Sequence, residues 1–575
     1  MSSDKHAPDP TRQKGGAPVA MRPTLAGTRH MVVAGHHLAS HAAFEILEAG
    51  GNAVDAGVAA CLTMSVVQSE FVNFAGVAPM MIRMAATGEV LTIDGLGWWP
   101  RAASLEHFIN ACGGTIPGGI LRTVIPGAPY AWITALEKFG TVTFAEVARA
   151  ATRFAAEGFV MYPLMSELIE TYAAGYARWP SNADIYLPGG RAPLAGELFI
   201  QADLARTLQY MADEEAGAGG SREAGLLAAR HAFYEGDIAN TICAYHEANG
   251  GWLTRDDLAE YYVEIEPALS VKFGESEIHA CGPWSQGPAL LMFLRLLRDD
   301  DLLALGHNSC AYVHTLTEVM KLVFADRERH FADPRHTPVP MEFLLSDAYT
   351  RERRGLVDPN RAFDDLPAPG VLKSDDACAA LDTSYTAVVD RFGNAFSCTP
   401  SDTCNNAPVV PGTGVAPSSR GSQSWAIRGH PCAVAPGRRP RLTPNPAMVV
   451  ANDGQFVMPF GTPGGDVQTQ AMLQTLLNLF VFKMTPQAAV EAPRFATYSF
   501  PASFEPHAHH PGRLNLEARI DEETGRALAA LGHDVDWWDT ITWRAGGVCL
   551  VAGDLERGVL EGAADPRRAA YALGW

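Results

Sequence analysis

The stretch from Leu381 to Thr403 constrains the fold more than any other part of the 575-residue chain. β-Favouring residues run from Ser384 to Val389, turn residues occupy positions 390–394, and a second β-favouring run extends from Ala395 to Thr399. This pattern predicts a β-hairpin, with Thr383 at the mouth of its first strand.

Thr383 could be more than a strand residue if the backbone were cut between Asp382 and Thr383. It would then carry a free α-amine beside its own hydroxyl, and such an amine has a pKa of roughly 7.7–8.0, suited to a general base near neutral pH. A hydroxyl activated by an N-terminal amine is an established nucleophile. The alternative is an ordinary Thr that opens a buried strand.

Further blocks of sequence favour the nucleophile. The stretch around Thr383 resembles the start of the small subunit in the γ-glutamyltranspeptidase family, whose members cut themselves before a Thr. The resemblance extends from about His30 to the C-terminus, through seven blocks in the family's order. These are Glu48–Asp55, Ile125–Ala128, Phe233–Ile238, Asn249–Leu258, Phe324–Arg327, Gly461–Gly465 and Ala492–Phe495.

The domain organisation follows from this resemblance. It implies an αββα sandwich of the N-terminal nucleophile hydrolase type, in which residues 30–382 form a large subunit and residues 383–575 a small one. The two would stay associated as one intertwined catalytic unit, with further homo-oligomerisation possible. The polar residues 1–29 are expected to form a disordered tail.

Local patterns independently favour an α/β layered fold. Apolar residues at helical spacing on both sides of Gly50-Gly51-Asn52 predict two helices within Leu38–Gln68. Residues 78–83 and 90–93 read as paired strands, and Val467–Phe480 reads as a helix.

Charge and composition limit the partners. The formal charge of −20 disfavours nucleic acids and anionic membranes. No apolar run is long enough to span a bilayer, and the start of the chain lacks the apolar segment of a signal peptide, so we expect a cytoplasmic protein. The ten cysteines are scattered without metal-ligand spacing and are expected to be reduced core residues.

No cofactor and no metal are predicted. The tightest histidine groups are His36, His37 and His41, where a helix begins, and His507, His509 and His510, in a loop expected at the surface. Capping and packing roles suffice for the first group, and the proposed chemistry needs no metal.

The resemblance also indicates partners for Thr383. It matches Ser401 with a Thr that positions the nucleophile, and Thr399 is a second candidate on the same stretch. It matches Gly464 and Gly465 with a glycine pair that lines the oxyanion hole, and glycines allow backbone N–H groups to approach a ligand closely. The alternative for this pair is a simple turn before a helix.

Three contacts that the family makes with its donor have changed. The Arg that binds the donor's α-carboxylate falls in the segment Asp94–Leu96, which has no Arg. A Ser pair that assists it is matched by Leu442-Thr443, and the Asp pair that holds the donor ammonium is matched by Gln423-Ser424. Arg420 is expected to line the pocket instead, which suits an acyl group with a carboxylate but no amine. The alternative for Arg420 is a structural ion pair.

Three functions remain open from the sequence. The favoured one is a self-processing amidohydrolase that uses Thr383 on a small-molecule amide of a carboxylate-bearing acyl group. The second is an authentic γ-glutamyl hydrolase or transferase that acts on glutathione or γ-glutamyl amides. The third is a binding protein without activity, against which the retained Thr383, Ser401, Gly464 and Gly465 argue.

Overall fold

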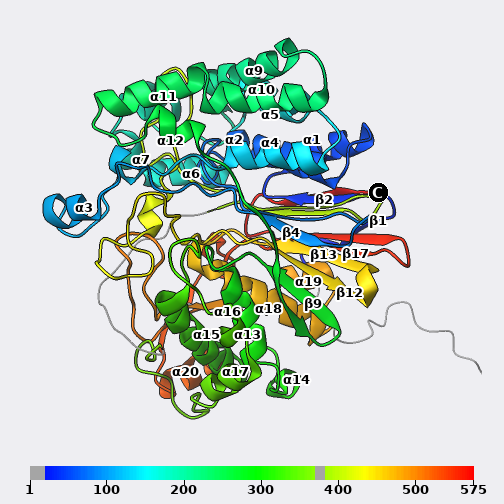
Figure 1. The fold of residues 1–575 in the computed structure, drawn as a ribbon. Helices are drawn as coiled ribbons and strands as arrows, with labels where there is room; N and C mark the ends of the chain where they lie inside the picture. Colours follow the sequence, from blue (N-terminus) through cyan, green and yellow to red (C-terminus); the bar gives the residue numbers. More distant parts are fainter. Residues whose placement is uncertain (1–19, 370–382) are drawn as a thin grey trace, which may run out of the picture.

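The computed structural model of the chain describes residues 20–369 and 383–575. Two β-sheets lie face to face between an upper and a lower layer of helices (Figure 1). The predicted αββα class is therefore confirmed. Asp382 and residues 1–19 of the predicted tail lie outside the described residues.

The nucleophile sheet, so named because it contains the hairpin that follows Thr383, has seven strands in the order β19-β2-β10-β11-β3-β4-β7. Neighbouring strands are antiparallel throughout. The strands are β2 (Met31–Ala34), β3 (Met80–Arg83), β4 (Val90–Ile93), β7 (Ile265–Pro267), β10 (Thr386–Val389), β11 (Ala395–Cys398) and β19 (Tyr571–Gly574).

The second sheet also has seven strands, in the order β1-β18-β17-β13-β12-β9-β8. They are β1 (Leu25–Gly27), β8 (Leu269–Phe273), β9 (Ser276–Ala280), β12 (Ala447–Ala451), β13 (Phe456–Gly461), β17 (Cys549–Asp554) and β18 (Val559–Ala564). The remaining strands form two small sheets. One consists of β5 (Phe159–Val160) and β6 (Leu198–Phe199), and the other of β14 (Phe495–Thr497), β15 (Arg513–Glu517) and β16 (Asp534–Trp538).

Helices cover the outer face of each sheet, and α1 and α2 contact the nucleophile sheet whereas α13, α18 and α19 contact the second sheet (Figure 1). The upper layer includes α1 (His37–Glu48), α2 (Ala53–Val67), α4 (Ala128–Phe139), α5 (Phe144–Glu157), α9 (Ala202–Gly217), α10 (Arg222–Tyr234) and α11 (Asp237–Ala248). The lower layer includes α13 (Gly287–Leu296), α15 (Cys310–His330), α17 (Asp347–Arg354), α18 (Gln468–Phe480), α19 (Pro486–Glu491) and α20 (Glu522–Ala530). Shorter helices are α3 (Leu105–Ala111), α6 (Pro163–Thr171), α7 (Ala173–Tyr176), α8 (Pro180–Tyr186), α12 (Arg255–Ala259), α14 (Leu302–Leu305) and α16 (Met341–Leu344).

The predicted hairpin is confirmed, and β10 shows why three apolar residues, Ala387 to Val389, follow one another in its sequence. Ala387 and Val389 pack in the core between the two sheets, whereas Val388 packs toward the upper helices. A strand buried on both faces needs apolar side chains at every position rather than at alternate ones.

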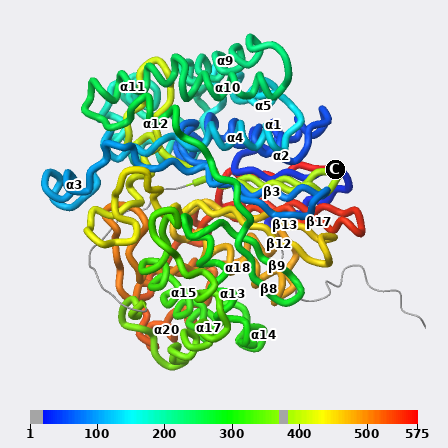
Figure 2. Tube along the Cα trace, viewed as in Figure 1, coloured from blue at the N-terminus to red at the C-terminus, as the bar shows by residue number. Residues whose placement is uncertain are grey.

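The two sides of Thr383 are interleaved in both sheets. In the nucleophile sheet β10 lies between its hairpin partner β11 and β2, which also pairs with the C-terminal strand β19. In the second sheet β12 lies between β9 and β13. The colours of Figure 2 show the same mixture of early and late segments in the middle of the molecule.

Several local predictions are confirmed and one boundary is wrong. Asn52 ends the turn between α1 and α2, and it forms a capping box with Asp55 at the start of α2. Leu25–Gly27, which we assigned to the disordered tail, instead forms β1 and pairs with β18. Over the described residues, no helix combines the length and the apolar character that crossing a membrane requires.

Candidate active site

Thr383 and Ser401 face each other across the mouth of the β10–β11 hairpin. They form an antiparallel bridge, and the Ser401 hydroxyl donates a hydrogen bond of 3.0 Å to Thr383 Oγ1. Both side chains are fully buried. The structure therefore brings the predicted nucleophile and its predicted positioning hydroxyl into contact.

A second donor to Thr383 was missed in the sequence. Gln468 is the first residue of α18, and its Nε2 donates to Thr383 Oγ1 at 3.4 Å. Its Oε1 accepts from the Asn445 backbone N–H at 3.2 Å, which fixes the orientation of the amide. The Thr383 oxygen thus accepts two hydrogen bonds, and donors at this position stabilise the negative charge that develops on a nucleophilic oxygen. The only sequence signal was the place of Gln468 just after the glycine pair.

Arg420 extends this chain of hydrogen bonds. It begins the short helical turn Arg420–Gln423, and its Nη2 donates to Ser401 Oγ. A guanidinium only donates, so the Ser401 oxygen accepts from Arg420 while its proton goes to Thr383. The Arg420 Nε also lies 3.7 Å from Asp402 Oδ2. Arg420 therefore contacts the predicted positioning serine and also lies within ion-pair distance of Asp402, the alternative that the sequence left open.

Asp402 holds the backbone beside Ser401 in a strained conformation. Its φ of +130° is rare for a residue other than glycine, and such a conformation costs of order 1–3 kcal/mol. Its carboxylate accepts from the Ser418 hydroxyl at 2.7 Å and from the Ser419 hydroxyl at 2.6 Å, and its N–H donates to Phe71 O at 3.1 Å. These bonds maintain the sharp bend that follows the positioning serine.

The glycine pair forms a turn that only glycine adopts readily. Gly464 has φ +127° and Gly465 has φ +55°, and the turn leads directly into α18. Within the described part of the chain no group accepts a hydrogen bond from either amide. Gln286 Nε2 stabilises the turn through a hydrogen bond of 2.9 Å to Gly465 O. Two N–H groups are therefore available to a ligand one helical turn from Gln468.

Two of the predicted substrate-binding residues join this arrangement. Gln423 Nε2 donates to Thr443 Oγ1 at 2.9 Å. Gln286, which holds Gly465, also donates to Thr443 O at 2.9 Å. The amide of Gln286 consequently links the segment of Gln423 and Thr443 to the glycine turn.

The other two residues predicted to bind substrate, Ser424 and Thr399, have different surroundings. The Ser424 hydroxyl accepts a bond of 2.9 Å from Trp99 Nε1, so it serves an aromatic cluster instead. The Thr399 hydroxyl is buried and has no hydrogen-bond partner among residues 20–369 and 383–575. Ser401 rather than Thr399 is thus the hydroxyl that contacts the nucleophile.

The changed donor-binding positions form one apolar wall. Leu96 and Leu442 pack in a single buried cluster with Val77, Cys281 and Trp284. Val77 exchanges backbone hydrogen bonds with Ser401, at 3.1 and 2.9 Å, so this wall adjoins the nucleophile. Asp94 instead accepts a bond of 2.7 Å from Arg439 Nη1, and burial raises the pKa of its carboxyl to about 6.

The histidine groups considered in the sequence have other roles. His36 caps α1 by accepting from the Leu38 N–H. His507, expected in a surface loop, is buried and stacks on Trp425 with ring centroids 3.7 Å apart. The described residues that could surround a metal lie elsewhere, where ligand atoms of His314, Glu318 and His533 lie within 4.8 Å of one another.

Comparison with known proteins places this site in context. The family model described as gamma-glutamyltranspeptidase matches residues 39–575. The acylase ACY 1 proenzyme of Pseudomonas sp. strain SE83 is 33% identical over 94% of this chain and 92% of its own length. The glutathione hydrolase-like YwrD proenzyme of Bacillus subtilis strain 168 is 28% identical over 96% of this chain and 100% of its own. The crystal structure of cephalosporin acylase from Bacillus halodurans superposes with a TM-score of 0.84, at 27% identity over 99% of both chains.

Proposed function

The chain belongs to the gamma-glutamyltranspeptidase family, and we propose from this that it is a self-processing amidohydrolase whose nucleophile is Thr383. The observation that carries the proposal is the pair of hydrogen bonds that Ser401 and Gln468 donate to Thr383 Oγ1. A buried hydroxyl with a structural role needs one hydrogen-bond partner, whereas two donors that converge on its oxygen also favour its ionised form. Two donors aimed at one hydroxyl oxygen are what a nucleophile requires.

Self-cleavage uses the same hydroxyl. Thr383 Oγ1 attacks the carbonyl carbon of Asp382, the peptide C–N bond breaks, and the hydroxyl proton passes to the released nitrogen. The chain is then joined through an ester between the Asp382 carbonyl and Thr383 Oγ1, and the α-amine of Thr383 is free. Water hydrolyses this ester to a carboxylate on Asp382 and restores the hydroxyl of Thr383. The product consists of residues 1–382 and residues 383–575.

Turnover repeats this chemistry on an amide substrate. The α-amine takes the proton of the Thr383 hydroxyl while Oγ1 attacks the substrate carbonyl, and the N–H groups of Gly464 and Gly465 stabilise the oxyanion. The proton passes to the leaving amine, and water then hydrolyses the acyl ester. The interleaved strands of both sheets support continued association of the two pieces, since separating them would expose the core between the sheets.

The acyl group is proposed to be small and to carry a carboxylate but no amine. Arg420 brings a buried cation next to Ser401, while the positions where the family resemblance would place carboxylate-binding groups hold Leu96 and Leu442, which are buried in one apolar cluster. The names of the acylase relatives support hydrolysis of an acyl amide. The names of the glutathione hydrolase relatives support γ-glutamyl amides as the second candidate.

The intact mass of the purified protein under denaturing conditions tests the nucleophile. We expect two fragments that meet at Asp382 and Thr383, and a single uncut, inactive chain for Thr383→Ala. Efficient cutting of that variant at the same bond would refute the assignment.

The rates of glutaryl and γ-glutamyl 4-nitroanilide hydrolysis then test the acyl group. These substrates differ only in the α-amino group, so they isolate its contribution. We expect kcat/KM to be at least about tenfold higher for the glutaryl compound. The reverse order would assign the protein to the γ-glutamyl hydrolases.

A further inference from the structure

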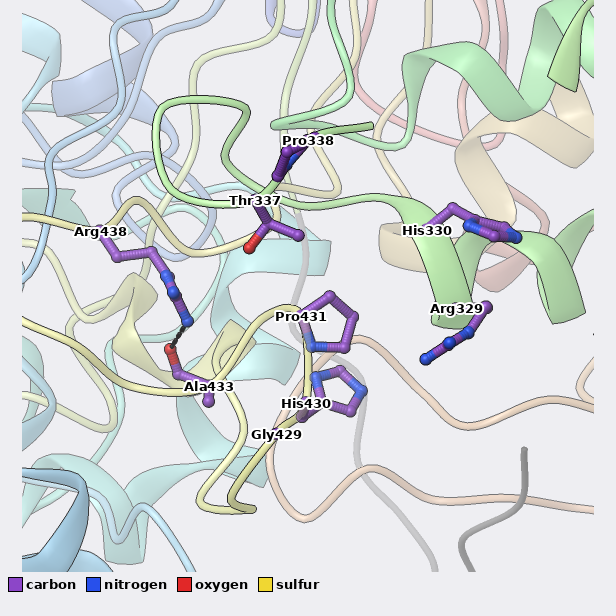
Figure 3. A pocket seen from close by; sticks show the side chains of 9 residues that line it. All are labelled: Arg329, His330, Thr337, Pro338, Gly429, His430, Pro431, Ala433 and Arg438. Carbon is purple, nitrogen blue, oxygen red and sulfur yellow. Dashed lines mark hydrogen bonds between the residues drawn. The ribbon is translucent and has the colours of Figure 1, made fainter. Parts of the chain in front are cut away.

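A basic pocket lies beside the segment that carries Gln423 and Ser424. It has a volume of about 450 Å³ and is formed by the end of α15, the loop through Thr337 and the loop 429–438. Arg329 and Arg438 extend toward it from opposite sides, and His430 and Pro431 lie between them (Figure 3). Its lining includes no carboxylate.

The two arginines differ from their neighbours in having no acidic partner. Arg327, Arg439 and Arg441 are ion-paired with Asp466, Asp333 and Glu328, respectively. Among residues 20–369 and 383–575, no carboxylate lies within ion-pair distance of Arg329 or Arg438. Two uncompensated cations that face one cavity in a chain of net charge −20 are the electrostatic pattern of an anion site.

Arg438 also has an unused donor at the pocket wall. Its Nη1 donates to Ala433 O at 3.0 Å, but its buried Nε has no acceptor in the described part of the chain. An unsatisfied buried donor is costly, and a carboxylate or phosphate that enters the pocket could remove the cost through a small movement of the guanidinium.

The pocket's positive charge comes from the arginines alone. Burial, followed by the charges of Arg441, His507 and Arg438, lowers the pKa of His430 to about 2. Burial also lowers the pKa of His330, and the positive charges of Arg329 and Arg353 act in the same direction. Both imidazoles are consequently neutral near pH 7.

The pocket is connected to the proposed active site through one aromatic stack. The His430 ring stacks on Trp425, with centroids 4.3 Å apart, and Trp425 directly follows Gln423-Ser424. Backbone bonds from Trp425 N to Cys432 O and from Val434 N to Trp425 O fold the loop back on itself. A second cavity of about 430 Å³ shares Arg329 and His430 with the pocket and continues to Trp425.

We propose that this pocket is an anion-binding subsite that receives a carboxylate or phosphate group on the leaving amine of the substrate. The assignment to the leaving amine rests on the proposed function, whereas the anion site itself does not. The site would add affinity for acyl amides whose amine part is anionic, at a position beyond the Gln423-Ser424 segment.

The first test measures binding without catalysis. Inorganic phosphate and succinate are titrated into the full wild-type chain by calorimetry at constant ionic strength, with chloride as the balancing ion. We expect saturable binding that is lost in Arg329→Gln/Arg438→Gln. Arg351→Gln/Arg557→Gln changes net charge equally at two exposed positions and should bind as the wild type does. No binding, or equal binding by all three proteins, would overturn the anion site.

The second test assigns the group that the site receives. Two substrates with the same acyl group are compared, glutaryl 4-nitroanilide and glutaryl 3-carboxy-4-nitroanilide. We expect the pocket variant to raise KM about tenfold for the carboxylated substrate and less than about twofold for the other. Lost phosphate binding with no selective change in KM would overturn the leaving-amine assignment and leave a site for a free anion. A protein that hydrolyses no amide would refute the proposed function, and the calorimetry would still decide the pocket.

Discussion

Two buried polar clusters in this molecule use similar residue types for different ends. The nucleophile cluster comprises Thr383, Ser401, Arg420 and Gln468, and the histidine cluster comprises His314, Glu318, Lys321 and His533. Each contains one buried cation and a chain of side-chain hydrogen bonds. The clusters differ in the groups at which these hydrogen bonds end.

The hydrogen bonds of the histidine cluster end at the backbone groups of Asp358 and Phe363 and include one ion pair. His314 Nε2 faces Asp358 O at 2.8 Å and must carry a proton, so His314 Nδ1 accepts from His533 Nε2, also at 2.8 Å. Lys321 Nζ lies 2.8 Å from Glu318 Oε1, which neutralises the carboxylate that a metal would need. The residue types suggest a metal site, but the lysine already supplies the cation.

The nucleophile cluster instead directs its donors at one atom, the oxygen of the proposed nucleophile. Arg420 donates to Ser401, Ser401 donates to Thr383, and Gln468 donates to the same Thr383 oxygen. A buried polar cluster is typical of a catalytic site when its donors converge on a nucleophile. It is typical of a stabilising site when every charge has an internal partner.

Among the substitutions that separate the two clusters, Lys321→Met should have the largest effect on stability. The substitution keeps the side-chain volume but leaves Glu318 buried without its counter-charge, so we expect a loss of about 3–5 kcal/mol in the free energy of unfolding. Urea denaturation measures this loss. The amidase kcat of the folded variant should stay unchanged, because the histidine cluster contacts none of the residues of the nucleophile cluster.

The double variant Lys321→Met/Glu318→Gln is the matched control. It removes both charges. In the wild type the Phe363 N–H donates to Glu318 Oε2 at 2.6 Å, and the glutamine keeps an acceptor for it. Most of the lost stability should return. If kcat fell with Lys321→Met, the separation of the two clusters would be wrong.

Ser401→Ala should show the opposite pattern. It removes the shorter of the two donors to Thr383 Oγ1, so both self-cleavage and amide hydrolysis should slow about 100-fold, or about 2.7 kcal/mol in activation free energy. The variant also removes the acceptor of the buried Arg420 Nη2, so the unfolding free energy should fall by about 1–3 kcal/mol, less than for Lys321→Met. Single-turnover rates and urea denaturation measure the two effects.

Ser401→Thr is the control for that variant, because it retains a hydroxyl at the position where the family resemblance places a Thr. Its self-cleavage rate should stay within about tenfold of the wild type. Equal rates for Ser401→Ala and the wild type would remove Ser401 from the mechanism.

The sequence predicted the parts of this structure that depend on local pattern or on the family resemblance. The β10–β11 hairpin, the Asn52 turn and the contact between Thr383 and Ser401 belong to that group. Local rules cover the hairpin and the turn because alternation and capping involve near neighbours in the chain, whereas the role of Ser401 was implied by the family resemblance.

Other parts depend on residues brought together from far apart in the chain. The pairing of His314 with His533 spans 219 positions, and the donation from Gln468 to Thr383 spans 85. The i, i+4 spacing of His314 and Glu318 on one helix was a visible signal, but nothing local indicated that Lys321 would neutralise the carboxylate. The predicted tail failed for the same reason, since Leu25–Gly27 is ordered by pairing with β18 near the other end of the chain.

The smallest effect should be a pH dependence of stability that His533 contributes. Burial, followed by the charges of Lys321 and His314, lowers the pKa of His533 from 6.5 to about 3. The unfolded chain therefore binds the proton first as the pH falls below about 6.5, and stability decreases toward acid.

Between about pH 7 and pH 5.5 this linkage should cost about 1 kcal/mol of unfolding free energy. His533→Gln keeps a donor for His314 Nδ1 and cannot titrate, so its stability should fall less over this interval. His41→Gln, at an exposed position on α1, should keep the wild-type slope. If His533→Gln also kept that slope, protonation of the histidine cluster would not be linked to unfolding, and the neutral hydrogen-bond order derived for it would be wrong.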